Sequence, residues 1–187
     1  MSAGTAALAV LASGHGTILE AMLAAGVPVG LVVTDRRCRA LEIGRDAGIG
    51  VDLVERTVFG PSFDRTAYTE QLVAVLTARG VQTVAMSGFM TVLAAPMFDV
   101  YGGRVLNTHP SLLPAFPGAH AVRDALAYGV KVTGCTVHIA TVNMDDGPIL
   151  AQEAVPVLDG DDEGRLHERI KAVERVLYPR VVKEFVG

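Results

Sequence analysis

The feature that most constrains the fold of this chain is the alternation of two kinds of segment along its first hundred residues. Short apolar runs rich in valine, which suit β-strands, lie at 6–13, 27–35, 51–55, 82–88 and 104–109. Amphipathic stretches with helical spacing lie between them, at 17–26, 40–48 and 63–80. Near-continuous apolar strands separated by helices indicate a parallel sheet covered on both faces. The sequence therefore predicts an α/β fold, a mostly parallel, Rossmann-like doubly wound sheet with helices on both faces.

The pattern changes after residue 109 but gives no sign of a second domain. A loop rich in proline and glycine precedes a predicted short helix, two further strands and a long amphipathic helix, at 121–129, 132–140, 149–157 and 161–186. A chain of 187 residues is a natural size for one domain with a full hydrophobic core. Because neither a linker nor a repeat interrupts it, we expect a single domain over 1–187.

The composition limits the classes of protein to which the chain can belong. Half of its residues are hydrophobic and 19% are charged, which excludes a disordered chain. Mean hydropathy is +0.39, yet no apolar run approaches the roughly 18 residues that cross a bilayer. The first run also lacks the basic flank and cleavage site of a signal peptide. Net charge is −4 without a basic stripe. We therefore expect a cytoplasmic protein with neither a membrane segment nor a nucleic-acid partner.

A glycine-rich loop, SGHGT at 13–17, joins the first expected strand to the first expected helix. Backbone amides at a helix N-terminus favour an anion, and glycines let a phosphate approach closely. We interpret the loop as a monophosphate site with the hydroxyl of Thr17 as a donor. Two alternatives stay open: a tight turn without a ligand, and a dinucleotide site in which Asp35 would bind a ribose. The dinucleotide pattern is incomplete, because Leu19 replaces its third glycine.

A second candidate site lies at the end of the fifth apolar run, where Asn107 and His109 are two residues apart. Side chains alternate along a strand, so both should project from the same face. Pro110 should end the strand and leave the pair at an exposed tip. An amide donor beside an imidazole suits a reaction that develops negative charge on an oxygen. Asp145 and Asp146 are consecutive in the loop between the two late strands, so only one of them should turn inward beside the imidazole.

Two other chemistries fit the sequence less well. No serine occupies the G-x-S-x-G pattern of an activated nucleophile. His109, His120, His138 and Asp145 could supply metal ligands, but they lack the spacing of known metal motifs, so we expect no metal. His138 alternates with apolar neighbours in CTVHIA, and we interpret it as a half-buried structural histidine.

The motifs now resemble one family. The blocks NTHPSLLPAFPGAHAVRDALAYGVKVTGCTVH and MDDGPILAQ resemble the folate-dependent formyltransferases, and LASGHGT, SGFM and ERVLYP favour the branch that acts on glycinamide ribonucleotide. The resemblance covers essentially the whole chain. It implies transfer of a formyl group from 10-formyltetrahydrofolate, a cosubstrate, to the amine of glycinamide ribonucleotide in purine biosynthesis. It implies small-molecule partners and no metal, and it leaves a homodimer possible. It also implies a nucleotide- and phosphate-binding half at 1–103 and a catalytic and folate-binding half at 104–187.

The resemblance implies three groups of site residues when it is carried over position by position. The catalytic group is Asn107, His109 and Asp145. The substrate-binding residues, with Glu174 matching an acid that holds the ribose hydroxyls, are Gly14, His15, Gly16, Thr17, Ile18, Gly88 and Glu174. The folate-binding residues, with Arg65 matching an arginine at the folate tail, are Arg65, Phe89, Met90, Thr91, Val92, Leu93, Asn107, Ala140, Thr141, Met144 and Asp145.

The chain departs from the family pattern at two places. The family's phosphate loop usually reads Gly-Ser-Asn where this chain has Gly16, Thr17 and Ile18, so a side-chain amide is missing. The family usually has arginine at the position of Thr91, so one expected folate contact is missing. Neither departure removes a catalytic group. Three alternatives remain: a formyltetrahydrofolate hydrolase, a sugar-amine formyltransferase of the same fold, or, in another class, a dinucleotide-binding oxidoreductase.

Overall fold

The computed structural model describes residues 7–187, so Ala6, where the first expected strand begins, lies outside the described residues. Within them, seven strands form one sheet in the order β3-β2-β1-β4-β5-β6-β7. The strands are β1 (Leu8–Ala12), β2 (Val29–Thr34), β3 (Gly50–Leu53), β4 (Thr83–Ser87), β5 (Val105–His109), β6 (Val132–Ile139) and β7 (Ile149–Pro156). Each of them lies in a segment that the sequence predicts to be a strand, except that β3 begins at Gly50, one residue before the predicted segment.

The sheet is mostly parallel, as its apolar strands predict. The strands β1 to β5 pair in parallel, whereas β6 runs antiparallel to β5 and β7 antiparallel to β6. The chain leaves β1 towards β2 and β3 on one side and returns to β4 on the other side. The carboxyl ends of β1 and β4 therefore meet at a topological switch point, which is where ligands bind in open α/β sheets.

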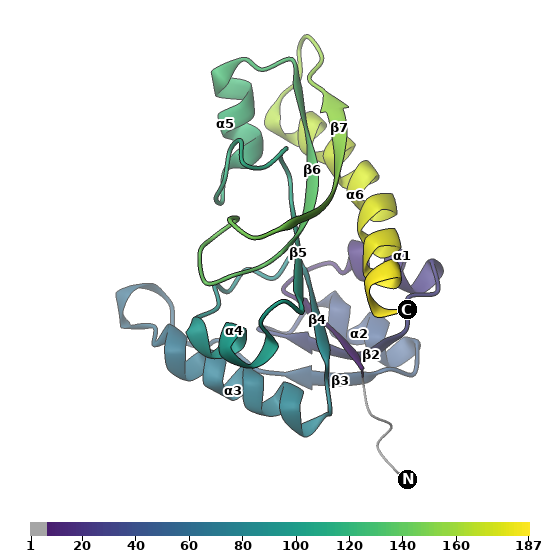
Figure 1. Cartoon of the computed structure of the whole chain (residues 1–187), viewed down its shortest axis with the longest axis vertical. Helices are drawn as coiled ribbons and strands as arrows, with labels where there is room; N and C mark the ends of the chain where they lie inside the picture. The colour runs from purple at the N-terminus through teal and green to yellow at the C-terminus, as the bar shows by residue number, and fades with distance from the viewer. Residues whose placement is uncertain (1–6) are drawn as a thin grey trace.

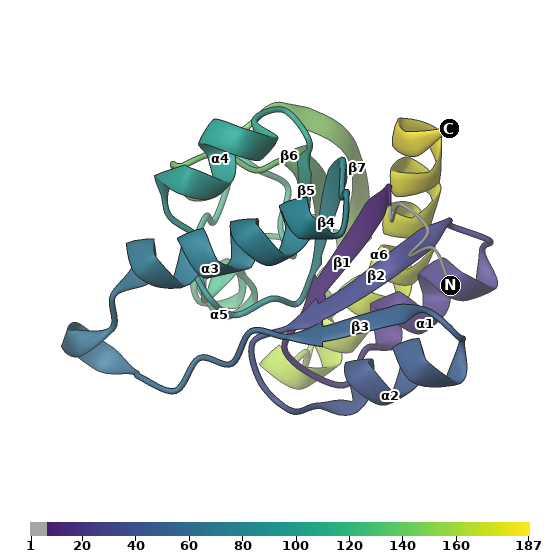
Figure 2. The ribbon, with the colours of Figure 1, turned by 90° about the horizontal axis from the view of Figure 1, so that it is seen from below.

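Helices cover both faces of the sheet (Figures 1 and 2). One face carries α1 (Thr17–Ala24), α2 (Arg39–Asp46) and α6 (Glu163–Val186), with α5 (Ala121–Tyr128) packed against α6. The other face carries α3 (Arg65–Ala78) and α4 (Ala95–Tyr101). A short 3-10 turn, Gly60–Ser62, precedes α3. The sheet thus separates two hydrophobic cores, which confirms the predicted doubly wound α/β fold.

Local sequence explains several of the helix boundaries. The carboxylates of Asp64 and Asp162 accept hydrogen bonds from backbone N–H groups in the first turns of α3 and α6. Gly129 follows α5 in a left-handed conformation, which glycine adopts without steric penalty and which often ends a helix. The sequence does not predict α4, because its seven residues are too few to establish a helical period.

The arrangement of the strands brings three loops to one edge of the sheet. Residues 13–17 follow β1, residues 88–93 follow β4, and residues 110–120 follow β5. A hydrogen bond joins the first two loops: the backbone N–H of Met90 donates to the hydroxyl oxygen of Ser13 at 2.8 Å. Among residues 7–187, no helix combines the length and the apolar character needed to traverse a bilayer.

Candidate active site

The glycine-rich loop presents backbone groups to solvent. Gly16 lies at φ 74°, a left-handed conformation that glycine adopts without steric penalty. The first backbone hydrogen bond of α1 runs from Glu20 N to Gly16 O, so the N–H groups of residues 17–19 precede the helical ladder and can face an anion. Ile18 is only 7% exposed and packs into the core. Its side chain faces away from solvent, so only the backbone of Ile18 is left to contact a ligand, and the missing side-chain amide at this position has no replacement in the side chain. Thr17 is partly exposed and His15 is exposed.

Asp35 is wholly buried beneath the loop that follows β4. Its carboxylate accepts two hydrogen bonds from Arg36, at 2.9 and 3.1 Å, and one from the hydroxyl of Thr91 at 2.7 Å. Burial alone would raise the pKa of Asp35, but these bonds outweigh it and hold the pKa below its ordinary value. The carboxylate is thus committed to the loop and not to a ribose. The dinucleotide interpretation loses the acidic residue that it needs.

The side chain of Thr91, one of the predicted folate-binding residues, points into the protein. The residue is 2% exposed, and its hydroxyl points at Asp35. Only the backbone of Thr91 remains to contact a ligand, because the side chain secures the loop from within. This agrees with the loss of the arginine contact that the sequence comparison with the family pattern implies at this position.

His109 and Asp145 come together from distant parts of the chain. The Nδ1 atom of His109 lies 3.4 Å from the Oδ2 atom of Asp145, and the same oxygen accepts a 2.8 Å hydrogen bond from the backbone N–H of Gly118. Asp145 has φ 56°, an uncommon conformation for a residue other than glycine that Asp and Asn tolerate best. This turn directs Asp145 inward and leaves the neighbouring Asp146 exposed. One of the two carboxylates thus faces the imidazole, as their consecutive positions predict.

The loop after β5 folds back over the histidine. Residues 110–120 form turns and bends without a regular element, and the carbonyl oxygen of Phe116 lies 2.8 Å from the Nε2 atom of His109. Phe116 itself has a positive φ of 52°. His109 is consequently only 5% exposed, and the predicted exposed tip is wrong. Proline ends the strand as expected, but the released chain covers the histidine.

Asn107 has a partner that the sequence interpretation missed. Its register places it opposite His138 on β6, and its Nδ2 atom lies 3.2 Å from the Nε2 atom of that histidine. The same Nε2 atom lies 3.8 Å from the Oδ1 atom of Asp145. His138 is 1% exposed rather than half-buried, and burial lowers its pKa. The candidate catalytic cluster therefore has four members, Asn107, His109, His138 and Asp145.

Only the pairing of β5 with β6 could have identified His138 as a member. The alternation in CTVHIA indicates from which face of its strand the histidine projects, but it does not indicate which strand lies beside it. Among residues 7–187, no three His, Cys, Asp or Glu side chains form a group that could hold a metal ion.

Glu174 lies on the opposite face of the sheet from this cluster. It belongs to α6 and faces the hydroxyl of Thr108, whose side chain projects from β5 on the side away from Asn107 and His109. Burial raises the pKa of Glu174, and the hydrogen bond from Thr108 only partly offsets this. The structure thus does not bring Glu174 into contact with the catalytic candidates. A ligand that touched both would have to pass around the end of β5.

The predicted folate-binding residues fall into two sets by burial. Leu93 and Ala140 are buried in the core beneath α3 and α4, and Phe89 packs against it. Large apolar side chains that are exposed are Met90 at 65%, Val92 at 45% and Met144 at 56%. Thr141 is partly exposed, and Arg65 is exposed in the first turn of α3. Gly88, which is predicted to bind the substrate and not the folate, is exposed beside them at φ 62°. Exposed apolar groups on two loops suit the binding of a flat, largely apolar ligand.

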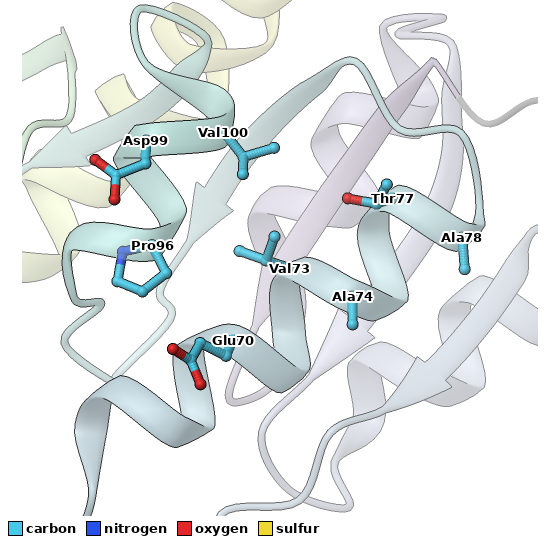
Figure 3. Close-up of a pocket in the computed structure, with 8 residues that line it drawn as sticks. All are labelled: Glu70, Val73, Ala74, Thr77, Ala78, Pro96, Asp99 and Val100. Carbon is cyan, nitrogen blue, oxygen red and sulfur yellow. The ribbon is translucent and has the colours of Figure 1, made fainter.

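A groove of about 690 Å³ elsewhere on the molecule contains none of these residues. It lies between α3 and α4 (Figure 3), and it is lined by Glu70, Val73, Ala74, Thr77, Ala78, Pro96, Asp99 and Val100. Its lining holds no histidine and no group that the cluster uses, so we do not assign the chemistry to it.

Known proteins resemble the chain over almost its whole length. A family model described as formyl transferase matches residues 6–182. A phosphoribosylglycinamide formyltransferase of Mycobacterium tuberculosis (strain CDC 1551 / Oshkosh) is 51% identical, over 92% of this chain and 81% of the relative. The protein of that name from Escherichia coli (strain K12) is 35% identical, over 95% of this chain and 86% of its own. A solved structure of glycinamide ribonucleotide transformylase 1 from Symbiobacterium toebii superposes with a TM-score of 0.89 at 44% identity, over 96% of this chain and 86% of that one.

Proposed function

The chain belongs to the formyl transferase family, and from this premise we propose that it transfers the formyl group of 10-formyltetrahydrofolate to the amine of glycinamide ribonucleotide in purine biosynthesis. The relatives that share most of its length carry the corresponding name. One structural observation supports the proposal most directly. Asn107, His109 and Asp145 converge in one cluster although they come from two separate elements of the chain.

The proposed reaction places each group of the cluster on one part of the transition state. The amine attacks the formyl carbon, a C–N bond forms, and negative charge develops on the formyl oxygen. An N–H of Asn107 and the protonated ring of His109 stabilise that oxygen. The bond from the formyl carbon to the folate nitrogen then breaks, and the proton released by the amine passes to that nitrogen. Asp145, 3.4 Å from His109, stabilises the protonated ring and assists this proton transfer through a water.

The loop after β5 takes part in this proposal. The Nε2–H of His109 donates to the carbonyl of Phe116 in the structure. The formyl oxygen can use that donor only after the carbonyl has moved. We therefore infer that residues 110–118 shift when the substrates bind, as irregular loops can do without breaking a sheet.

The substrates are assigned to the loops around the cluster. The phosphate is placed at the amides of residues 16–18, and the ribose hydroxyls are placed at Glu174. The ribonucleotide thus bends around the carboxyl end of β5. The folate is placed against the exposed apolar side chains of Met90, Val92 and Met144, with its anionic tail towards Arg65. Neither ligand is confined to one of the expected halves, since Glu174 lies in 104–187 and Arg65 lies in 1–103. The two halves belong to one sheet, in which β4 pairs with β5.

One experiment separates this function from its rivals within the fold. Purified protein is given 10-formyltetrahydrofolate alone, with glycinamide ribonucleotide, or with an amino sugar nucleotide, and release of tetrahydrofolate is followed. Release that requires the ribonucleotide supports the proposal. Release without it indicates a hydrolase, and release only with an amino sugar nucleotide indicates a sugar-amine formyltransferase. The homodimer and the cytoplasmic location stay predictions of the sequence.

A further inference from the structure

His138 is a buried ionisable side chain that has no role in the reaction proposed for Asn107, His109 and Asp145. It lies beside all three of these residues, Asn107, Asp145 and His109. A histidine at 1% exposure needs a hydrogen-bond partner for each ring nitrogen or loses free energy. The identity of these two partners fixes the position of its proton.

The two hydrogen bonds of His138 allow one neutral form. Its Nδ1 atom lies 3.2 Å from the carbonyl oxygen of Ile139. A carbonyl oxygen can only accept, so Nδ1 must carry the hydrogen. In the neutral ring Nε2 is then an acceptor, and its partner at 3.2 Å is the Nδ2 group of Asn107, which can only donate. The geometry thus agrees with the Nδ1–H tautomer and with one orientation of the Asn107 amide.

From this geometry we propose that His138 is a positioning residue, which orients the Asn107 amide so that its remaining N–H is available to the formyl oxygen. The inference rests on the proposed function for its consequence in catalysis, but the hydrogen-bond geometry is independent of that function. The Nδ2 group carries two hydrogens, and one of them is used by His138. A protonated His138 would donate from Nε2, and the amide would have to rotate and present its oxygen instead.

The surroundings of His138 favour the neutral ring. The carboxylate of Asp145, on the loop after β6, lies 3.8 Å from Nε2 and favours the charged form. Burial and the ring of His109 on β5 oppose it. The balance lowers the pKa of His138, with burial as the largest cause. The acceptor that Asn107 requires is therefore present at neutral pH.

The first test reads the tautomer directly. The protein has five histidines, and the ring ¹⁵N shifts of the labelled protein at pH 7.5 distinguish Nδ1–H, Nε2–H and doubly protonated rings. The signals of His138 are identified by their absence from the spectrum of His138→Gln. An Nδ1–H ring supports the proposal. An Nε2–H or doubly protonated ring overturns it, whatever the enzyme is found to catalyse.

The second test compares two replacements of the same residue. His138→Gln can place its side-chain oxygen near the position of Nε2 and so retains an acceptor, whereas His138→Leu retains bulk without one. We expect kcat of His138→Leu to fall by up to the roughly 10²–10³-fold loss of an oxyanion donor, with the KM values of both substrates changed by less than about threefold. His138→Gln should restore most of the loss. His167→Gln and His167→Leu, on α6, provide the matched controls.

The third test asks whether His138 acts through Asn107. The double variant Asn107→Ala/His138→Leu should have a kcat less than about twofold below that of Asn107→Ala alone. The reason is that the amide which His138 orients is already absent from Asn107→Ala. Equal losses in both backgrounds would overturn the proposal. So would a His138→Leu enzyme with full kcat, or a His138→Gln enzyme as impaired as His138→Leu. If His138→Leu does not fold, the tautomer and the His138→Gln rate still decide the question. A wild-type enzyme that transfers no formyl group would refute the proposed function but leave the tautomer result intact.

Discussion

The proposed phosphate loop at residues 13–17 and the candidate catalytic cluster around His109 lie at the same edge of the sheet, but the first is built from backbone groups and the second from side chains. The loop offers backbone N–H groups at the start of α1, and its side chains point to the core or to solvent. The cluster offers side chains, each fixed by a specific hydrogen-bond partner. A site made of backbone tolerates changes of side chain that a site made of side chains does not.

The departures of this chain from its family follow that difference. The family's asparagine in the phosphate loop is replaced by Ile18, whose side chain lies in the core, and the amides that face outward are unaffected. Asn107, His109 and Asp145, the proposed catalytic residues, all match the family pattern. Two glycines extend the contrast. A Cβ added at Gly16 would meet the flexible end of Ile43 at 2.6 Å, whereas one added at Gly147 would overlap the backbone carbonyl oxygen of Ile139.

The largest expected effect comes from the side chains of the cluster. Asn107→Ala removes a proposed oxyanion donor and should lower kcat by about 10²–10³-fold. Asp145→Asn should lower kcat while folate binding changes little, because the carboxylate acts on the transition state. Since both residues serve one transition state, the double variant should be scarcely worse than the poorer single variant. Strictly multiplicative losses in steady-state rates would contradict a shared site. The exposed Asp146→Asn is the matched control and should retain full kcat.

The next largest effect should come from Gly147→Ala. The added Cβ must push the loop of residues 143–148 away from β6, which moves Asp145 from His109. A displacement of about 1 Å can lower a rate by roughly 10²-fold. We expect this loss in kcat together with a lower Tm. Gly164→Ala, in α6 and with only an ordinary contact at 3.4 Å, should change neither. A fully active Gly147→Ala enzyme would show that the loop position is not required.

A smaller effect, on binding alone, is expected at the phosphate loop. Gly16→Val places a β-branched residue at φ 74°, where an L-residue costs about 1–2 kcal/mol. The Kd for glycinamide ribonucleotide in calorimetry should rise about tenfold, with kcat at saturation nearly unchanged. Gly48→Val meets the same backbone strain at φ 69° with open space around it, so it should lower stability and leave the Kd unaltered. An unaltered Kd in Gly16→Val would place the phosphate elsewhere.

The smallest effect concerns stability and pH. The pKa of Glu174 is raised by burial. The stability associated with this group is therefore present below its unfolded pKa and is lost as pH rises through the folded pKa. Glu174→Gln has no carboxyl group to ionise at this position and so avoids this loss of stability. The Tm of the variant minus the Tm of the wild type should therefore be larger at pH 7.5 than at pH 4. Ribonucleotide affinity should fall at the same time. A Tm difference that does not change with pH would contradict the assigned burial effect.

Patterns along the chain were sufficient to predict the layers of this fold and the positions of its strands. Short valine-rich apolar runs and helical spacing are local properties, so 104–109 and 63–80 were identifiable without any knowledge of their neighbours. The inward turn of one aspartate also follows from the adjacency of Asp145 and Asp146. The helix α4 was missed because seven residues give too short a pattern.

The parts of the site that the sequence did not predict depend on contacts between distant segments. His138 joins Asn107 only through the register of β5 and β6. The cover over His109 comes from a carbonyl seven residues away, and the inward direction of Thr91 comes from Asp35 on the far side of β1. None of these contacts has a local signature, because each depends on which segment lies beside another in three dimensions.

The five residues of β5 place a restriction on how a gene for this protein can change. The side chains of Asn107 and His109 project from one face of the sheet, towards the candidate active site. The side chain of Thr108 between them projects from the other face, towards Glu174 on α6. A single codon gained or lost just before Asn107 would exchange the two faces and send every one of these groups to the wrong side. A change of two codons would keep the faces but shift the partners along β6. Descendants of this gene can therefore vary in length within their loops, but this strand must be inherited without insertion or deletion.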